Sequence, residues 1–253
     1  MPAKKIKIGN LELGNLPVVV GTVCTELKLH SKAIERVDVF EIRIDMLKYE
    51  SIPDIFKVIS SIKHRYQKPL IATIRSKKEG GLRHIDDNER YTIFEKIISL
   101  VEMLDIELSS TKLIEKVSQL CKKNKKPLMA SYHNFNETPD KKDLKKLLEQ
   151  SRKYNTSIFK IAVQANTKKD LAHLINFTIE NKDAGLVTIS LGAIGLVSRI
   201  VNPMIGSLMT YGYVDRVAAL GQLSVFDVID YIRLFDSAYN EKLIEKTKLL
   251  QAV

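Results

Sequence analysis

Short apolar runs alternate with amphipathic stretches along almost the whole chain of 253 residues. The runs are apolar on both faces, which is typical of strands that are covered on both sides in a parallel sheet. Strands that alternate with helices along one chain favour an α/β fold. The eight candidate strands are Val18–Cys24, Phe40–Met46, Leu70–Arg75, Met103–Leu108, Leu128–His133, Ile158–Gln164, Leu186–Leu191 and Arg216–Leu220.

The segments between these runs carry helical periodicity. Between residues 52 and 59, for example, apolar side chains recur at the i, i+3, i+4 and i+7 positions of one helix face. Eight strand–helix units in a chain of this length predict a (β/α)8 barrel, the TIM barrel fold. An open doubly wound sheet is the alternative, and it is weakened because no run is followed by a Gly-rich dinucleotide-binding turn.

Two additions to the barrel are expected at the ends of the chain. Lys5–Ile8 and Leu11–Leu13, joined by Gly9-Asn10, predict a short N-terminal β-hairpin. The stretch from Val225 to about Leu250 predicts the eighth barrel helix and an extra C-terminal helix. No stretch rich in Pro, Gly or Ser divides the chain, so residues 1–253 are expected to form a single domain.

The net charge of +10 lies largely in lysine-rich helix faces such as residues 122–126. No aromatic residues are interleaved with these lysines, so we interpret them as solvated faces and expect no nucleic-acid partner. No apolar run approaches the roughly 20 residues of a membrane span, and the N-terminus lacks the apolar core of a signal peptide. Cys24 and Cys121 have no metal-ligand spacing. We therefore expect no membrane association and a reducing, cytoplasmic location.

The run Ile158–Gln164 holds one charged residue, Lys160, among apolar neighbours. Lysine is almost never fully buried unless it has a partner or a function. Burial disfavours the ammonium form, and a neutral amine is a nucleophile toward a carbonyl carbon. The alternative is a lysine that reaches water at the strand end or pairs with a carboxylate. This strand alone does not separate the two interpretations.

Polar residues gather at the predicted strand ends, where a barrel carries its chemistry. One lysine, one histidine, three arginines and several carboxylates would face one mouth. This set suits Schiff-base chemistry on an anionic, hydroxylated carbonyl compound, with histidine moving protons and arginine binding a carboxylate. Taken singly, a strand-end histidine is more often structural, and Asp45 and Glu107 could be internal salt-bridge partners, which we favour for Asp45. The residues are Glu41, Arg43, Asp45, Arg75, Asp105, Glu107, His133, Lys160, Arg199 and Gln222.

These stretches closely resemble the type I 3-dehydroquinate dehydratases (3-dehydroquinases) over essentially the whole chain. The block Asp105-Ile-Glu107-Leu, followed after about 20 residues by Leu128-Met-Ala-Ser-Tyr-His133-Asn, is a specific signature of that family. The resemblance implies a barrel that dehydrates 3-dehydroquinate to 3-dehydroshikimate in the shikimate pathway. The other matching blocks are Glu41-Ile-Arg43-Ile-Asp45, Arg75-Ser-Lys-Lys-Glu79-Gly-Gly, Lys160-Ile-Ala, Gly195-Leu-Val-Ser-Arg199 and Gly221-Gln222.

The resemblance implies catalytic roles for three residues. Lys160 would form a Schiff base with the C3 ketone of the substrate. His133 would remove a C2 proton as general base and then protonate the departing C1 hydroxyl, which gives a syn elimination. Glu79 would orient or tune the histidine ring. Because the iminium serves as the electron sink, no metal or organic cofactor is expected.

The resemblance also implies how the substrate is held. Arg199 matches the arginine that binds the substrate carboxylate. Glu41, Arg43 and Arg75 match positions that hold the ring hydroxyls, and Gln222 matches a glutamine in the loop that closes after the last strand. Members of the family are commonly dimers, so a homodimer is expected.

The sequence departs from the family pattern at three positions. Ala218 stands where a substrate-contacting serine is common, and the loss of one hydrogen bond costs about 0.5–1.5 kcal/mol. Leu220 replaces a proline, which predicts a less rigid loop. Thr22 occupies a place near the first strand where serine is frequent, and it is a candidate substitute for that hydroxyl. These departures predict weaker substrate binding without loss of the chemistry.

Two alternative functions remain compatible with a barrel. A sugar-phosphate aldolase would also use a Schiff-base lysine, and the segment 192–199 could be read as its phosphate site. The cluster of Glu41, Arg43 and Arg75 favours the dehydratase. A non-catalytic barrel would be expected to have lost the lysine or the histidine, and both Lys160 and His133 are present.

Overall fold

The computed structural model describes residues 6–25, 35–217 and 221–251. Its centre is one sheet of eight strands, in the spatial order β10-β3-β4-β5-β6-β7-β8-β9, and each hydrogen-bonded pair is parallel. Where the two ends of this order meet, the backbone N–H of Leu208 donates to the carbonyl of Leu186 at 2.7 Å. The sheet is a nearly closed barrel, which confirms the predicted fold. Its strands are β3 (Val19–Val23), β4 (Val39–Arg43), β5 (Leu70–Thr73), β6 (Met103–Glu107), β7 (Leu128–Asn134), β8 (Ile158–Gln164), β9 (Leu186–Leu191) and β10 (Thr210–Tyr213).

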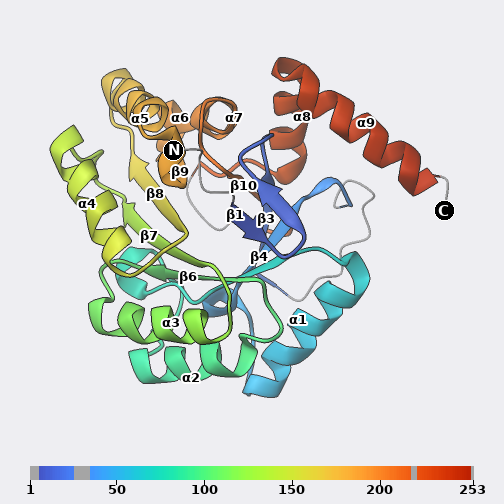
Figure 1. The fold of residues 1–253 in the computed structure, drawn as a ribbon, viewed down its shortest axis with the longest axis vertical. Coiled ribbons are helices and arrows are strands. Elements are labelled where there is room, and N and C mark those ends of the chain that lie inside the picture. The colour runs from blue at the N-terminus through green and yellow to red at the C-terminus, as the bar shows by residue number, and fades with distance from the viewer. Residues whose placement is uncertain (1–5, 26–34, 218–220, 252–253) are drawn as a thin grey trace.

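Helices surround the strands, and the last helix packs outside this ring against its predecessor (Figure 1). The first helix buries Ile55, Ile59 and Ile62 on one face, as its periodicity predicts. None of the described helices combines the length and apolar character that crossing a membrane requires. The α-helices are α1 (Ile52–Tyr66), α2 (Asp87–Ile97), α3 (Thr111–Lys123), α4 (Lys141–Lys153), α5 (Lys168–Glu180), α6 (Gly192–Gly195), α7 (Ser198–Met204), α8 (Val225–Phe235) and α9 (Ser237–Gln251), and the 3-10 helices are η2 (Ile44–Met46), η3 (Lys77–Glu79) and η4 (Lys182–Ala184). The predicted extra C-terminal helix is thereby confirmed as α9.

The predicted N-terminal hairpin is confirmed as β1 (Ile6–Ile8) paired antiparallel with β2 (Leu11–Leu13). Gly9 begins its turn with φ +60°, a conformation that glycine adopts without steric cost. The side chains of Ile6, Ile8 and Leu13 are buried in one apolar cluster with residues from the barrel interior. The hairpin therefore closes the amino-terminal end of the barrel.

The side chains that fill the barrel change from apolar to polar along the strands. In β8, Ile158 belongs to the apolar cluster beside the hairpin, and Lys160 lies two residues further along on the same face. In β4, Val39 and Glu41 repeat this order. The outer faces of the strands form a second apolar cluster with the helices. This arrangement leaves the carboxyl end of the barrel as the polar end.

The second predicted strand, Phe40–Met46, is too long. The strand β4 ends at Arg43, and Asp45 lies in the 3-10 helix η2. The carboxylate of Asp45 accepts hydrogen bonds from the backbone N–H groups of Arg75 and Leu82, at 3.1 Å each. The chain turns here because Asp45 ties β4 to the segment that follows β5, and this contact between distant residues is invisible in the local pattern.

The eighth strand of the barrel is β10 at Thr210–Tyr213, so its predicted position at Arg216–Leu220 is wrong. Of that predicted stretch, Arg216 and Val217 belong to no strand, and residues 218–220 lie outside the described residues. Asp215 already belongs to a loop, where its carboxylate accepts hydrogen bonds from the backbone N–H groups of Cys24 and Thr25. The strand β10 has four residues including a glycine, so it is less apolar than the stretch that follows it. The family departures at Ala218 and Leu220 lie outside the described residues.

Candidate active site

One cavity opens at the carboxyl ends of the strands, and all the predicted catalytic and substrate-binding residues line it. Asp45, Asp105 and Glu107, which were also expected to face this mouth, do not line the cavity. The residues reach it from β4, β7 and β8 and from the segments that follow β5, β9 and β10. The barrel thus brings together groups that are far apart in the sequence. The lining residues are Thr22, Glu41, Arg43, Arg75, Glu79, Gly80, His133, Phe135, Lys160, Ala162, Ile189, Leu191, Arg199, Tyr211 and Gln222.

Lys160 is buried on β8, with 5% of its surface exposed. Its Nζ lies 3.4 Å from Glu41 Oε1 and 3.4 Å from Asp105 Oδ2. The amine also lies 3.9 Å from the centre of the Tyr211 ring. The pairing of this lysine with carboxylates is thereby confirmed, and its role as a nucleophile stays a prediction for an amine that lines the cavity. The two ionic contacts are long for charge-assisted hydrogen bonds, so the amine is held loosely.

His133, on β7, is fixed by Glu79. Glu79 Oε2 lies 2.9 Å from Nδ1 of the ring and accepts a hydrogen bond from the backbone N–H of His133 at 3.0 Å. The other oxygen, Oε1, accepts a hydrogen bond from the hydroxyl of Ser109. No described residue makes a hydrogen bond to Nε2, so this ring nitrogen is available to a bound molecule.

Burial and nearby charges shift the pKa values of both His133 and Glu79. Burial, assisted by the positive charges of Arg75, Lys160 and Arg43, places the pKa of His133 well below its usual value of 6.5. Burial raises the pKa of Glu79 to about 7, although the hydrogen bond from Ser109 opposes the shift. At neutral pH the imidazole is therefore uncharged, which is the state that a general base requires.

A buried ionic network lies beneath the cavity. The guanidinium of Arg75 donates to Asp105 Oδ1 at 2.8 Å, to Glu107 Oε1 at 3.1 Å and to the hydroxyl of Ser131 at 2.6 Å. Arg90, from helix α2, donates to Glu107 Oε2 at 2.5 Å. Burial opposes the ionisation of Asp105, but the charges of Arg75 and Lys160 prevail and lower its pKa. Arg75 thus organises the carboxylates around the lysine.

Arg43 forms an ion pair with a carboxylate of the protein, that of Asp45. Its Nε and Nη2 donate to the two oxygens of Asp45 at 3.0 and 2.9 Å. The sequence favoured Asp45 as a salt-bridge partner, and the structure confirms that preference. The bidentate pair orients the guanidinium toward the cavity, where Nη2 also reaches the carbonyl of Gly80 at 3.4 Å.

Arg199 differs from the other two arginines of the site. The residue is 2% exposed, and its hydrogen bonds to described residues go to two neutral carbonyl groups, those of Gly221 at 3.2 Å and Tyr211 at 3.1 Å. Among the described residues no carboxylate lies within ion-pair distance of Arg199, and burial lowers its pKa to about 10. A buried guanidinium without an anionic partner favours the binding of an anion from outside.

Gln222 and Thr22 connect the last loop to the first barrel strand. The side-chain amide of Gln222 donates to the hydroxyl of Thr22 at 3.3 Å. That hydroxyl donates to Glu41 Oε2, also at 3.3 Å. The predicted substitute hydroxyl of Thr22 therefore lies in the cavity, beside the carboxylate that contacts the lysine.

Sequence reasoning missed three residues around the reactive groups. Asp105 was expected at the mouth but was given no role, yet it contacts the lysine amine. Ser109 bonds to Glu79, and no local signal in the sequence indicates this contact. Tyr211 was missed because the last strand was misplaced. The β-branched and aromatic run Thr210–Tyr213 would have placed that ring in the barrel.

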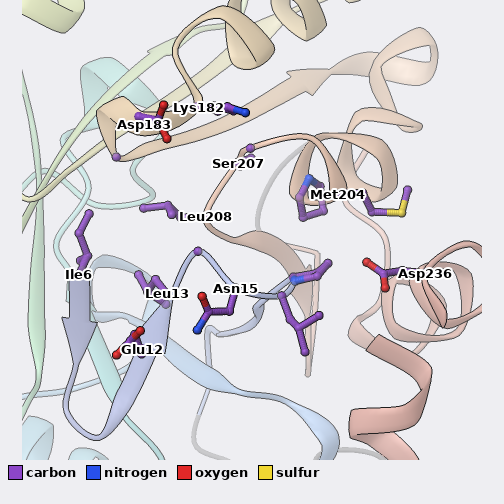
Figure 2. Close-up of a pocket in the computed structure, with 16 residues that line it drawn as sticks. Ile6, Glu12, Leu13, Asn15, Lys182, Asp183, Met204, Ser207, Leu208 and Asp236 are labelled. Carbon is purple, nitrogen blue, oxygen red and sulfur yellow. The ribbon is translucent and has the colours of Figure 1, made fainter. Parts of the chain in front are cut away.

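A larger cleft lies at the opposite, amino-terminal end of the barrel, between the hairpin and the segments that precede β9 and β10 (Figure 2). Glu12 and Asn15 border it on one side and Lys182, Asp183 and Ser207 on the other. None of the predicted site residues lines this cleft. We assign the candidate active site to the smaller cavity, because Lys160 as the predicted nucleophile, His133 as the predicted proton carrier and the arginines meet only there among the described residues.

Three comparisons with known proteins show what the whole chain resembles. The sequence model of the type I 3-dehydroquinase family matches residues 16–238. The chain is similar to the 3-dehydroquinate dehydratase of Thermodesulfovibrio yellowstonii, with 33% identity over 225 residues that cover 88% of this chain and 97% of that protein. It is similar to the Methanococcoides burtonii enzyme of the same name, with 33% identity over 226 residues, 88% of this chain and 96% of that protein. Its structure resembles 3-dehydroquinate dehydratase from Geobacillus kaustophilus, with a TM-score of 0.84, 25% identity, and coverage of 92% of this chain and 97% of that one.

Proposed function

The chain belongs to the type I 3-dehydroquinase family, and we propose that it is a hydro-lyase that dehydrates 3-dehydroquinate to 3-dehydroshikimate in the shikimate pathway. One observation carries the proposal. Lys160, His133 and Arg199 line the same cavity, so a nucleophile, a proton carrier and an anion-binding group surround one bound molecule. These are the groups that imine-based elimination from a carboxylated ketone requires.

The first step joins the substrate to Lys160. The amine attacks the C3 carbonyl carbon, and the resulting carbinolamine loses water to give a protonated imine. The ammonium and the ketone together give the iminium and one water, so the step releases no net proton. The loose contacts of Nζ with Glu41 and Asp105, both at 3.4 Å, support this role because little hydrogen bonding must be broken before attack.

The second step moves a proton through His133. Nε2 takes the proton from C2, and the electron pair flows into the iminium to form an enamine. The imidazolium then gives its proton to the C1 hydroxyl, which leaves as water while the enamine electrons form the C1–C2 double bond. Hydrolysis of the conjugated iminium releases the product and restores the amine of Lys160. One base on one face of the ring fits a syn elimination.

Glu79 supports the histidine during this cycle. Its contact with Nδ1 fixes the ring and directs Nε2 to the substrate. When His133 takes the proton, the carboxylate stabilises the imidazolium that forms. The lowered pKa of His133 keeps the imidazole neutral before the reaction. It also makes the imidazolium that forms a stronger acid, which favours transfer of its proton to the leaving hydroxyl.

The remaining groups fit the other parts of the substrate. We assign the substrate carboxylate to Arg199, because its guanidinium is buried and, within the described part of the chain, donates only to neutral carbonyl groups. The ring hydroxyls are assigned to Glu41, Arg43, Arg75 and Gln222. For Arg75 this role is shared with the support of Asp105 and Glu107, which occupy most of its donors.

We also propose that the chain acts as a single barrel domain in a cytoplasmic homodimer. Tyr231, Leu234 and Phe235, near the end of α8, are 47%, 71% and 71% exposed. An exposed apolar patch of this kind is typical of a protein–protein contact. Cys24 and Cys121 are both free and buried, which fits a reducing compartment. Light scattering of the purified protein, with Leu234→Lys as the disrupting variant, tests the dimer.

A direct assay tests the activity. The purified chain is mixed with 3-dehydroquinate, and the ultraviolet absorbance of the conjugated product is followed. Wild-type protein should form this product without added metal or cofactor, and Lys160→Ala should form none while it keeps the circular dichroism of the folded barrel. A wild-type protein that forms no product from 3-dehydroquinate would contradict the proposed function.

A further inference from the structure

The ring of Tyr211 forms one wall around the amine of Lys160. Nζ lies 3.9 Å from the ring centre, a distance at which the negative face of an aromatic ring attracts a cation. Tyr211 is 3% exposed, and its hydroxyl points away from the amine, to Met129 Sδ at 3.7 Å. Burial places the pKa of this phenol well above its usual value, so the hydroxyl stays protonated and the ring stays neutral. Tyr211 therefore presents an aromatic face, and no proton acceptor, to the reacting nitrogen.

We propose that the aromatic face of Tyr211 is a catalytic group that stabilises the positive charge of the iminium on Lys160. This inference rests on the proposed function, because it concerns the cation formed in that reaction. The nitrogen of Lys160 would then be stabilised by a cation–π contact in addition to the carboxylates of Glu41 and Asp105.

The ammonium and the iminium of Lys160 differ in their number of N–H groups, and this difference explains why an aromatic ring would help to stabilise the iminium. An ammonium has three N–H groups and can donate to Glu41 and Asp105 at once. The iminium keeps the positive charge but has a single N–H, so at most one carboxylate remains directly hydrogen-bonded. The attraction of a cation to a ring face needs no N–H, so the contact with Tyr211 persists when the carboxylate contacts are reduced.

The arginines of the cavity increase the need for a group that stabilises the iminium. Arg43, Arg75 and Arg199 line the same cavity and repel a further cation. The carboxylates of Glu41 and Asp105 offset part of this repulsion. Exclusion of water by a bound substrate would strengthen the remaining attraction to the ring, since cation–π contacts gain strength when they are desolvated.

A series of fluorinated rings separates this electrostatic role from packing. Phenylalanine carrying none, one, two or three ring fluorines at position 211 keeps nearly the same volume, while each fluorine weakens the negative face of the ring. We expect kcat to fall stepwise, by about tenfold across the series, with a smaller change in KM. The fraction of enzyme trapped by borohydride at saturating 3-dehydroquinate should fall in parallel.

Ordinary variants provide the matched controls. Tyr211→Leu removes the ring face and should reduce kcat and the trapped fraction most, and Tyr211→Phe should recover most of that loss. Tyr91→Leu makes the same change on α2, where Lys116 Nζ lies 5.9 Å from the ring centre, outside the cavity. Its kcat should equal that of the wild type.

Two outcomes would overturn the inference. If kcat and the trapped fraction stay constant across the fluorinated series while the wild type forms its adduct, the ring only fills space, and the proposed function survives. If the wild-type protein itself forms no adduct, the proposed function fails and this inference fails with it.

Discussion

Glu79 holds His133 at two points, because one carboxylate oxygen lies 2.9 Å from the ring nitrogen Nδ1 and 3.0 Å from the backbone nitrogen. The contact joins η3, after β5, to β7, and it leaves Nε2 directed to the cavity. The tautomer with the proton on Nδ1 is favoured while Glu79 is ionised, and only that tautomer has a free electron pair on Nε2. In the proposed mechanism, the ionisation of Glu79 therefore governs whether His133 can act as a base.

The first prediction concerns the pH dependence of kcat. Because the pKa of Glu79 is raised to about 7, its carboxylate form is lost as the pH falls through 7. The pKa of His133 is lowered, so the ring itself protonates only at more acidic pH. Wild-type kcat should therefore decrease below an apparent pKa near 7. In Glu79→Gln this limb should move to lower pH, with kcat reduced about tenfold or more on the plateau. An unchanged acid limb in Glu79→Gln would assign it to another group.

The second prediction separates imine formation from proton transfer. His133→Ala keeps Lys160 and the cation sites, so it should still form the borohydride-trapped adduct with 3-dehydroquinate. Its kcat should fall by about 10²–10⁴, the usual contribution of a general acid–base group. Mass spectrometry of the adduct and the ultraviolet assay measure the two steps. Normal turnover by this variant would exclude His133 as the base.

The third prediction concerns the substrate carboxylate. Arg199→Met removes the only cavity arginine that has no carboxylate partner among the described residues, and KM should rise about 10–100-fold with a smaller change in kcat. An analogue of the substrate with the carboxylate reduced to an alcohol provides the control. The wild type should bind this analogue much more weakly than 3-dehydroquinate, and Arg199→Met should bind both alike. If the variant still prefers the carboxylate, another residue binds it.

The fourth prediction concerns stability. Arg90 is 1% exposed and donates to Glu107, which is 0% exposed. Arg90→Met would leave one oxygen of this buried carboxylate without its cation and should lower the free energy of unfolding by about 3–5 kcal/mol. Arg152→Met breaks an exposed ion pair with Glu149 on α4 and should cost less than about 1 kcal/mol. Urea unfolding measures both, and similar losses in the two variants would contradict the role of the buried network.

The sequence predicts most of the barrel because its strands are apolar enough to be read locally. The run Ile158–Gln164 is the strand β8 without any change of bounds, and Leu186–Leu191 is β9. The strand β10 was misplaced because its four residues carry two tyrosines and a glycine, and pairing with β3 rather than its own apolar character makes it a strand. Tertiary context decides such short strands.

The residues of the site could be predicted by type and order, but their contacts could not. Lys160 can be recognised in its strand because a lysine among buried apolar residues requires an ionic partner or a function. Its carboxylate partners, Glu41 and Asp105, lie 119 and 55 residues away in sequence, and the fold of the barrel brings them to the lysine. The same holds for Arg90, whose helix lies outside the barrel while its guanidinium reaches the network beneath the cavity.

The most direct test of the proposed imine mechanism is borohydride reduction of the protein in the presence of 3-dehydroquinate, followed by peptide mass mapping. We expect one covalent adduct on Lys160, dependent on both the substrate and the reductant, and no adduct in Lys160→Ala. An unmodified Lys160, or an adduct on another lysine with Lys160 unmodified, would contradict it.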